Sequence, residues 1–225
     1  MHICRSLYEE IMKHLREILS LRNDRELKSD NSFVTKGDLL IQSVIMDFMR
    51  IYAPSYVMIS EETDLEGFLY DPGKDYVVVD PIDGTENFTS GLKEWGVSVS
   101  FYSHDSHVES MLAMPELDVK LISGDQVPKY ASRIYGLSSS LSKEYLIGLS
   151  PGWEYRIMGC AVYNLLNVIQ GSFAVYENPV GANAWDILAG LNLALEHGFK
   201  VSVNDGEYHG NFLTPNHKYR FRLSN

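Results

Sequence analysis

The segment Tyr76–Phe88 constrains the fold more than any other part of this chain, because a strand-like run ends directly in two carboxylates. Residues 76–79 are aromatic and β-branched, which is typical of a buried strand. Asp80 ends this run, and Asp83 follows three residues later, directly before Gly84. A glycine there permits a tight turn and a close approach of the backbone to a ligand. Two carboxylates fixed at a strand end, beside free backbone amides, suit a bound metal ion together with an anion.

Taken alone, this segment does not establish a metal site. An Asp-x-x-Asp-Gly sequence also occurs as an ordinary acidic turn after a strand. An EF-hand calcium loop does not fit, because no acid lies two residues after Asp80 and Pro81 interrupts the pattern. The interpretation as a metal site therefore depends on what the rest of the chain supplies.

The spacing of apolar residues predicts a mixture of helices and short strands. Apolar residues at steps of three and four predict amphipathic helices, and short β-branched runs predict strands. The expected helices are 3–21, 37–51, 157–170 and 184–197, the last closed by Gly198; the expected strands are 56–59, 76–79, 96–102, 108–114, 119–123 and 172–176. The polar stretch 28–32 is expected to be a loop, and short strands are expected after Gly198. Helices mixed with strand pairs indicate a layered mixed α/β or α+β fold.

Composition excludes several classes of function. A chain of 225 residues with 45% hydrophobic content can bury a core without disulfides or a structural metal. The net charge of −11 argues against general nucleic-acid binding. Cys4 and Cys160 fit no zinc or disulfide pattern, which favours a cytoplasmic protein. No long apolar run predicts a membrane span, and residues 1–5 do not resemble the start of a signal peptide.

Two further segments accompany the acidic strand end. Ser60-Glu61-Glu62 precedes it, and Ala184-Trp185-Asp186 follows it at the start of a predicted helix. With Asp80-Pro81-Ile82-Asp83-Gly84-Thr85-Glu86-Asn87-Phe88 between them, the three segments resemble the inositol monophosphatase family. The family's pattern is roughly a Glu-Glu pair, then Asp-Pro-Ile-Asp-Gly-Thr-x-Asn-Phe, then Trp-Asp before a helix. The resemblance extends from about Asp30 to Gly198.

The resemblance implies metal ligands at matching positions. Glu61, Asp80, Asp83 and Asp186 match ligands of the family through their side chains, and Ile82 matches one through its backbone carbonyl. All are hard oxygen donors, which suit Mg²⁺ better than zinc. Glu62 is interpreted as a solvated acid or one that lies behind the ligands, and Trp185 as a packing residue.

The resemblance also implies catalytic residues. Glu61 and Thr85 match residues that orient and activate a water molecule for attack on the phosphorus atom. Asp38, in Val34-Thr35-Lys36-Gly37-Asp38, matches the acidic partner of that threonine. The position of Asp38 is equally consistent with an acid that stabilises the first turn of a helix.

Contacts to the substrate are implied at a third set of positions. These are Asp83, Gly84, Thr85, Gly159, Cys160, Ala161, Glu177 and Asp186. The amides of Gly84 and Thr85 would receive the phosphate. Glu177 would accept hydrogen bonds from substrate hydroxyls, or else is a plain loop acid.

Together these matches imply a layered αβαβα sandwich of the α+β class, formed as one domain over residues 1–225 with halves at about 1–125 and 126–225. The implied function is Mg²⁺-dependent hydrolysis of an inositol or sugar phosphate, with a small phosphorylated substrate as partner and a homodimer as a possible assembly. Two alternatives remain open: a 3′(2′),5′-bisphosphate nucleotidase of the same superfamily, and a non-catalytic regulatory relative.

The chain departs from the family pattern in four places. Residues 115–150 are shorter than usual, and so is the segment after Gly198. Ser60 stands where many relatives have glycine, and Glu86 where a neutral residue is common. The shortened segments bear on the shape of the substrate and on the contacts between subunits, and an added acid at position 86 would alter either the choice of substrate or the binding of metal.

Overall fold

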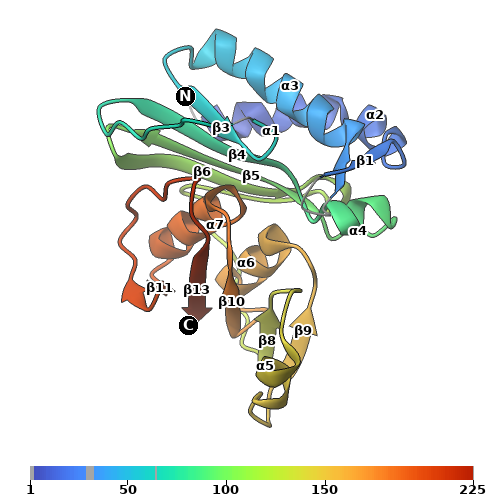
Figure 1. Ribbon diagram of the computed structural model, residues 1–225, viewed down its shortest axis with the longest axis vertical. Helices are drawn as coiled ribbons and strands as arrows, with labels where there is room; N and C mark the ends of the chain where they lie inside the picture. The colour runs from blue at the N-terminus through green and yellow to red at the C-terminus, as the bar shows by residue number, and fades with distance from the viewer. Residues whose placement is uncertain (1–2, 29–32, 64, 225) are drawn as a thin grey trace.

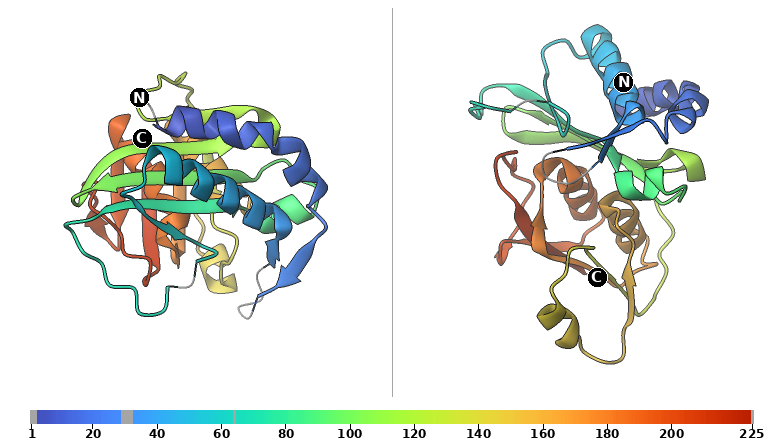
Figure 2. Two further views of the ribbon diagram at one scale, coloured as in Figure 1. Left: turned by 90° about the horizontal axis from the view of Figure 1, so that it is seen from above. Right: turned by 45° about the vertical axis from the view of Figure 1, so that its right-hand side comes forward.

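The chain folds into alternating layers of helix and sheet (Figure 1). The computed structural model describes residues 3–28, 33–63 and 65–224. Three N-terminal helices cover one face of a five-stranded sheet, two further helices cover its other face, and a six-stranded sheet follows beneath them. Figure 2 presents the same order of layers from two other directions.

The first half of the chain builds the outer helices and the five-stranded sheet. The helices are α1 (Ile3–Lys13), α2 (Leu15–Ser20), α3 (Lys36–Tyr52) and α4 (Thr85–Thr89), with a 3₁₀ turn, η1 (Pro115–Leu117). The strands β1 (Arg25–Leu27) and β2 (Phe33–Thr35) pair with each other. The sheet has the order β3-β4-β5-β6-β7, formed by Val57–Ser60, Asp75–Asp83, Gly96–Ser103, Ser106–Met114 and Val119–Ile122. Its only parallel pair is β3 with β4 within the described residues.

The second half builds the inner helices and the six-stranded sheet. The helices are α5 (Lys143–Ile147), α6 (Ala161–Ile169) and α7 (Ala184–Glu196). The sheet has the order β12-β11-β13-β10-β8-β9, formed by Gly206–Glu207, Lys200–Val203, Tyr219–Ser224, Val175–Ala182, Ile134–Leu137 and Glu154–Ile157. The pairs β10–β8 and β8–β9 are parallel.

Strand β4 is buried on both faces, which explains its continuous apolar run. Val77 and Val79 pack into the core under the outer helices, whereas Tyr76 and Val78 pack into the core formed with α6 and α7. Successive side chains of β4 therefore point alternately into two different hydrophobic cores. The position of the strand end, and of the acids that it carries, is fixed from both sides.

A β-bulge interrupts the pairing of β4 with β5 at the acidic segment. Asp80 is opposite Ser98, but Asp83 is opposite Gly96, so one extra residue lies on β4 between these pairs. In a regular strand, residues three apart face opposite sides. The bulge removes this alternation and suits Pro81, which has no N–H to give to a neighbouring strand.

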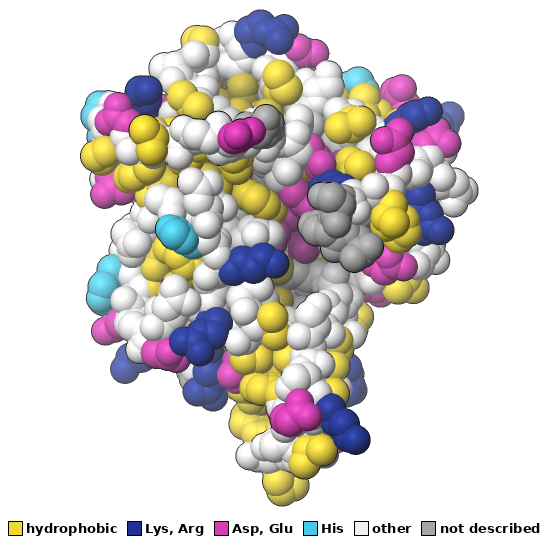
Figure 3. Space-filling view, viewed as in Figure 1, with side chains coloured by type: hydrophobic (Ala, Val, Ile, Leu, Met, Phe, Trp, Pro, Cys, Tyr) yellow, Lys and Arg dark blue, Asp and Glu magenta, His cyan; other side chains and the backbone are white. Residues whose placement is uncertain are grey.

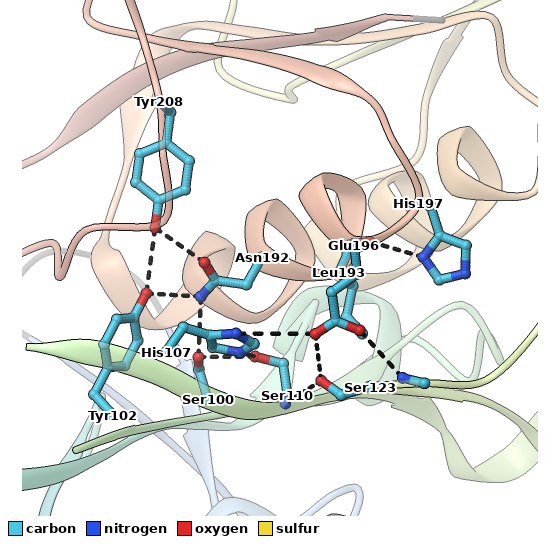
Figure 4. A network of polar contacts seen from close by, with 11 residues as sticks. Ser100, Tyr102, His107, Ser110, Ser123, Asn192, Leu193, Glu196, His197 and Tyr208 are labelled. Atoms are coloured by element: carbon cyan, nitrogen blue, oxygen red, sulfur yellow. Dashed lines mark hydrogen bonds and ion pairs between the residues drawn. The ribbon is translucent and has the colours of Figure 1, made fainter.

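Helix α7 is held on the five-stranded sheet by a buried polar network around Asn192 (Figure 4). Asn192 is 2% exposed, and its amide nitrogen lies 2.7 Å from Tyr102 Oη and 3.3 Å from Ser100 Oγ. Tyr208 Oη lies 3.3 Å from Asn192 Oδ1 and 3.2 Å from Tyr102 Oη. Because these groups satisfy one another away from water, they fix the position of the helix along the sheet.

Helices α6 and α7 approach each other closely at a glycine. A Cβ atom built on Gly190 would lie 2.4 Å from Leu165 Cδ1. No side chain fits at position 190. The two helices can lie this close only because the residue there is glycine.

Most expected elements are present, with differences at their ends. The predicted helix 3–21 is two helices separated at His14, whose amide bonds to the carbonyl of Ile11 three residues back. This tighter turn leaves the apolar spacing unchanged, so periodicity could not reveal it. The predicted helix 157–170 begins only at Ala161, because Gly159 has a φ of +68°.

The strand predictions also need correction. The predicted strand 172–176 begins at Val175 and continues to Ala182, and β4 extends through Asp83. Strands β1, β2, β8 and β9 and helix α5 were not predicted from the sequence. Most of the predicted loop at 28–32 lies outside the described residues.

The predicted α+β class and layered architecture are confirmed. The five-residue helix α5 lies beside β8 and β9 at the end of the molecule furthest from α1–α3, and none of its side chains is buried (Figure 1). No helix of the described residues is long and apolar enough to cross a membrane.

Candidate active site

A polar cavity of about 490 Å³ lies where the end of β4 meets the first turns of α6 and α7. Its lining includes ten of the residues predicted from the sequence: Glu61, Asp80, Ile82, Asp83, Gly84, Thr85, Gly159, Cys160, Ala161 and Asp186. In the space-filling view, acidic side chains gather in a hollow near the middle of the face shown (Figure 3). Of the predicted site residues, Asp38 and Glu177 do not line the cavity.

Three carboxylates from three different elements meet in this cavity. Glu61 follows β3, Asp80 lies in β4, and Asp186 lies in the first turn of α7. Each offers one oxygen atom, and these oxygens all lie within 4.8 Å of one another. Residues far apart in sequence thus form one compact group of oxygen donors.

The electrostatics of this group call for a cation. Asp80 is 1% exposed, and its Oδ1 atom has no hydrogen-bond partner among the described residues. Burial raises the pKa of Asp80 well above its usual value, and the charges of Glu61, Asp83 and Asp186 raise it further. Burial together with Asp83 and Glu61 likewise raises the pKa of Asp186. Such carboxylates are stable in the ionised form only with a positive charge beside them, so the residues present fit a divalent metal ion.

Lys28 supplies one positive charge at the edge of this group. Its Nζ atom lies 3.0 Å from Glu61 Oε1 and 2.6 Å from Glu62 Oε1. The side chain of Glu62 is 8% exposed, so Glu62 is not a solvated acid; it lies behind Glu61 and shares the lysine with it. No motif in the sequence indicates this position for Lys28, since it lies in a polar stretch predicted to be a loop.

Asp83 joins the two halves of the molecule beside the carboxylate group. Its Oδ2 atom accepts hydrogen bonds from the amide of Val162 (2.5 Å) and from Cys160 Sγ (3.0 Å). Burial raises the pKa of Asp83 to about 6, although these two hydrogen bonds act in the opposite direction. Gly84 follows with a φ of +80°, and a Cβ atom there would lie 3.0 Å from Cys160 Cβ. A glycine is therefore required on both conformational and steric grounds.

Thr85 and Asp38 do not form the pair expected from the sequence. Thr85 Oγ1 donates to the carbonyl oxygen of Ile82 (3.0 Å). Asp38 instead accepts from the amide and the hydroxyl of Thr35, the residue directly before α3. It therefore caps this helix, in agreement with the alternative role of an acid in a first turn.

Asp38 nevertheless lies near the acidic group. Burial raises the pKa of Asp38 to about 7 against the effect of its hydrogen bonds to Thr35, and the charges of Glu62 and Glu61 add to the rise. Its Oδ1 atom has no partner in the described parts of the chain. Asp38 thus supports the site from behind, without a hydrogen bond to Thr85.

Glu177 lies outside the cavity. Its carboxylate accepts a hydrogen bond from Tyr135 Oη, and Arg222 Nε lies 3.9 Å away. Glu177 lines a separate depression with Arg220 and Arg222. The sequence could not reveal this, because the position of Glu177 just after an apolar run does not determine which face of the sheet it occupies.

Several residues of the cavity were not predicted. They are Phe33, Glu86, the run Ser138-Ser139-Ser140, Asn164, Tyr176, Asn178, Val180, Gly181, Ala182, Asn183 and Lys218. In the sequence, Glu86 is distinctive only as a departure from the family pattern, and the serine run only as a polar stretch. Lys218 is the one basic side chain in the described lining, and no sequence motif accompanies it. Trp185 packs against the inner core, as expected.

Comparison with known proteins agrees with this geometry. The family model described as "Inositol monophosphatase family" matches residues 1–128. The 3′(2′),5′-bisphosphate nucleotidase CysQ of Escherichia coli (strain K12) is 27% identical over 192 residues, which are 77% of this chain and 77% of CysQ. A fructose-1,6-bisphosphatase/inositol-1-monophosphatase of Thermotoga maritima is 26% identical over 192 residues, 77% of this chain and 72% of that protein.

Solved structures share the fold at lower identity. A crystal structure of an IMPase/NADP phosphatase complexed with Mg²⁺ and phosphate superimposes with a TM-score of 0.81 at 19% identity, covering 99% of this chain and 88% of that one. A Ca-bound IMPase family protein from Staphylococcus aureus gives 0.82 at 17% identity, covering 99% and 90%. The family match spans more than half of the chain, and the acidic segments that suggested it meet in one cavity. The chain belongs to the inositol monophosphatase family.

Proposed function

We propose that this protein is a Mg²⁺-dependent phosphomonoesterase whose substrate is an inositol phosphate or a sugar phosphate. One observation carries the proposal: Glu61, Asp80 and Asp186 bring oxygens within 4.8 Å of one another on the wall of a cavity of about 490 Å³. A cavity of this volume accommodates a small phosphorylated molecule. Carboxylate oxygens without nitrogen or sulfur donors favour Mg²⁺ over zinc.

The proposed role of each residue in binding metal or phosphate follows from its position in the cavity. Glu61, Asp80 and Asp186 would hold the metal, with Asp83 and the carbonyl of Ile82 as further donors at the end of β4. Divalent ions held there would offset the charge of a phosphate ester and would lower the pKa of a water molecule bound to them. Amides of Gly84 and Thr85 and the turn 159–161 would orient the phosphoryl group from the opposite side.

Proton transfer and the orientation of the attacking water would be carried out by residues at or beside the proposed metal ligands. Glu61, which matches the family residue that orients and activates the attacking water, would accept its proton; its carboxylate is paired with Lys28 at the edge of the group. Thr85 would orient this water through its hydroxyl, whose proton is directed to the carbonyl of Ile82. Asp38 would act on the site only through charge, because its hydrogen bonds are to Thr35.

A second candidate function is the hydrolysis of a 3′,5′-bisphosphate nucleotide. The observation that favours it is Lys218, which adds a positive charge to a lining otherwise rich in acids. A second phosphate on the substrate would pair with this lysine. CysQ is a nucleotidase of this kind and is 27% identical.

Phosphate release from a panel of esters tests the proposal. The panel holds an inositol 1-phosphate, several sugar phosphates, 3′-phosphoadenosine 5′-phosphate and NADP, each with Mg²⁺, with EDTA, and with EDTA followed by excess Mg²⁺. Preferred hydrolysis of the inositol or sugar phosphate is expected, lost with EDTA and regained with Mg²⁺.

The remaining outcomes separate the alternatives. Preference for the bisphosphate nucleotide identifies the second candidate. No hydrolysis of any ester, by protein whose melting temperature rises with Mg²⁺, identifies a regulatory relative. Activity that persists after thorough chelation contradicts the metal-dependent reaction.

A further inference from the structure

A bulge interrupts strand β10 beside the cavity. Residues 179–181 separate Asn178 from Ala182 on β10, whereas Arg220 alone separates their two partners on β13. Paired antiparallel strands otherwise advance residue by residue, so two extra residues project from the ladder here. We call residues 179–181 the β10 bulge. Because β13 offers one residue to these three, the backbone groups of the β10 bulge need partners from elsewhere.

The side chain of Asn178 supplies such a partner. Asn178 is 7% exposed, and its Oδ1 atom accepts from the amide of Val180 (3.1 Å) and from that of Gly181 (2.8 Å). An asparagine that bonds to backbone amides two and three residues ahead holds a turn in one conformation. Gly181 has a φ of +115°, and a Cβ atom on it would lie 3.1 Å from Lys218 Cβ. The β10 bulge is thus fixed by Asn178 and packed closely against Lys218.

The β10 bulge and its neighbours form part of the cavity lining. The residues of this part are Asn178, Val180, Gly181, Ala182, Asn183 and Lys218. None of the six has a carboxylate, so this part of the lining adds no anionic ligand for Mg²⁺. Val180 is 52% exposed, and an exposed apolar side chain at a cavity is a surface for an organic group. The carboxylates serve the metal and the phosphate, and the β10 bulge remains for the alcohol part of an ester.

The chain returns to regular pairing before it reaches the proposed metal ligand in α7. Ala182 lies opposite Tyr219, and the amide of Asn183 donates to Asp186 Oδ2 (2.8 Å). These contacts, which follow the bulge in the chain, hold Asp186 in the first turn of the helix. A change confined to residues 178–181 can therefore alter the lining without moving Asp186.

We propose that Asn178 is a positioning residue for substrate selection: it fixes the β10 bulge as the surface on which the alcohol part of the ester lies. This inference rests on the proposed function, because it assumes that an ester is hydrolysed in this cavity. Asn178 acts through the β10 bulge and not on the phosphoryl group. Its loss affects an ester with a large alcohol more than one with a small alcohol, since only the large one extends to the bulge.

Hydrolysis of two esters with Mg²⁺ tests this role. Inositol 1-phosphate and glycerol 1-phosphate share the phosphate and differ in the size of the alcohol. For Asn178→Ala, the ratio of kcat/KM for the inositol ester to that for the glycerol ester is expected to fall roughly tenfold, through KM more than kcat. Asn178→Asp keeps the acceptor oxygen and is expected to retain the ratio of the wild type. The charge that it adds acts on both esters alike and cancels in the ratio.

Amide hydrogen exchange of the full chain gives a second measurement, which needs no turnover. In Asn178→Ala, the amides of Val180 and Gly181 lose their acceptor, and their exchange is expected to be about tenfold faster or more. Asn178→Asp is expected to keep both amides protected. The rise in melting temperature with Mg²⁺ is expected to match that of the wild type in both variants, because Asp186 is held by contacts beyond the bulge.

Two further variants control this experiment. Asn204 Oδ1 accepts from the amide of Arg220 (3.0 Å) and lies outside the described lining, so Asn204→Ala loses the same kind of hydrogen bond away from the cavity. It is expected to lower the melting temperature and to keep the ratio. Gly181→Ala retains Asn178 but places a methyl group against Lys218 at a strained φ. It is expected to lower the ratio as Asn178→Ala does.

Four results would contradict the proposal. An unchanged ratio in folded Asn178→Ala that hydrolyses both esters would show that the bulge does not select the alcohol. An equal fall of the ratio in Asn204→Ala would show a general effect of lowered stability. Exchange at Val180 and Gly181 as slow as in the wild type would show that other contacts hold the bulge. A wild type that hydrolyses neither ester would instead refute the proposed function, and this role with it.

Discussion

The backbone amide of Val162 donates a hydrogen bond of 2.5 Å to the carboxylate of Asp83, which joins the first turn of α6 to the end of β4. Through this contact, a wall of the cavity and the strand that carries the acidic segment are held together. Asp83 therefore has both a structural contact and a charge at the candidate site, and a substitution can separate the two.

Asp83→Asn removes the charge and keeps an oxygen that can accept from Val162. We expect phosphate release to fall at least ~10²-fold, the effect of losing one key electrostatic group. The melting temperature without metal should not fall, because the asparagine keeps the acceptor for Val162 and removes a buried charge whose pKa burial raises. Turnover close to that of the wild type would contradict the assignment. Asp83→Ala, which also removes the acceptor, should lower both activity and stability.

Asp80→Asn should stabilise the metal-free protein while abolishing activity. Asp80 is buried among Glu61, Asp83 and Asp186, and its pKa is raised for that reason. Removing this charge should increase the free energy of unfolding in EDTA near neutral pH by more than about 1 kcal/mol. Mg²⁺ should then raise the melting temperature less than in the wild type. Glu177→Gln, outside the cavity, is the matched control and should not alter the response to Mg²⁺. If Asp80→Asn instead lowers the stability in EDTA, the four carboxylates do not repel one another in the metal-free protein, and the prediction is wrong.

The stability of the metal-free protein should fall as the pH rises. Burial raises the folded-state pKa of Asp80 and Asp186, and that of Asp38 to about 7. The unfolded chain releases these protons near pH 4, so between that pH and the raised values the folded state binds more protons. The stabilisation is complete below the unfolded-state pKa and is lost as the pH passes the folded-state values.

Urea unfolding in EDTA across mildly acidic to neutral pH measures this slope. Excess Mg²⁺ should reverse it, because the ion replaces the protons. Asp80→Asn should make the slope shallower. Stability in EDTA that increases with pH over this range would contradict the prediction.

Asn192→Ala should weaken the attachment of α7 to the five-stranded sheet. The change leaves the buried hydroxyls of Ser100, Tyr102 and Tyr208 with fewer partners. We expect the free energy of unfolding to fall by about 1–3 kcal/mol. Asn216→Ala, at an exposed position, is the control and should have little effect. Equal stability of the two variants in urea unfolding would show that the network of Figure 4 does not hold the helix.

Lys218→Gln should discriminate between the two substrate classes. Lys218 lines the cavity, so removing its charge should raise the KM for 3′-phosphoadenosine 5′-phosphate, which has a second phosphate. A rise of roughly tenfold is expected for loss of one charge-assisted contact. The KM for an inositol monophosphate should change much less, and Lys218→Arg should retain the behaviour of the wild type. The same change for both substrates would exclude this role.

The sequence predicted the elements that carry the acidic segments better than it predicted their surroundings. The run at 76–79 predicted a buried strand because both of its faces are apolar, and Ala184-Trp185-Asp186 predicted the start of a helix. Family resemblance then suggested which acids meet. Ten of the twelve predicted site residues line one cavity for this reason.

The positions of the other site residues could not be predicted from the spacing of apolar residues, because they depend on bulges, strand register and tertiary packing. Asp80 and Asp83 are three apart, and only the bulge opposite Ser98 and Gly96 explains how both line one cavity. Glu177 lies outside the cavity because the register of β10 with β8 and β13 determines its neighbours. Lys28 and Lys218 approach through loops whose paths are set by tertiary packing, and no local pattern indicates their destinations.

Gly190 has a further consequence for the cavity. It allows α6 and α7 to lie so close that an added methyl group would overlap Leu165. The first turns of these same helices line the cavity, through Ala161 and Asp186. A glycine buried between two helices, which does not line the cavity itself, thereby sets the spacing of two elements that carry its lining.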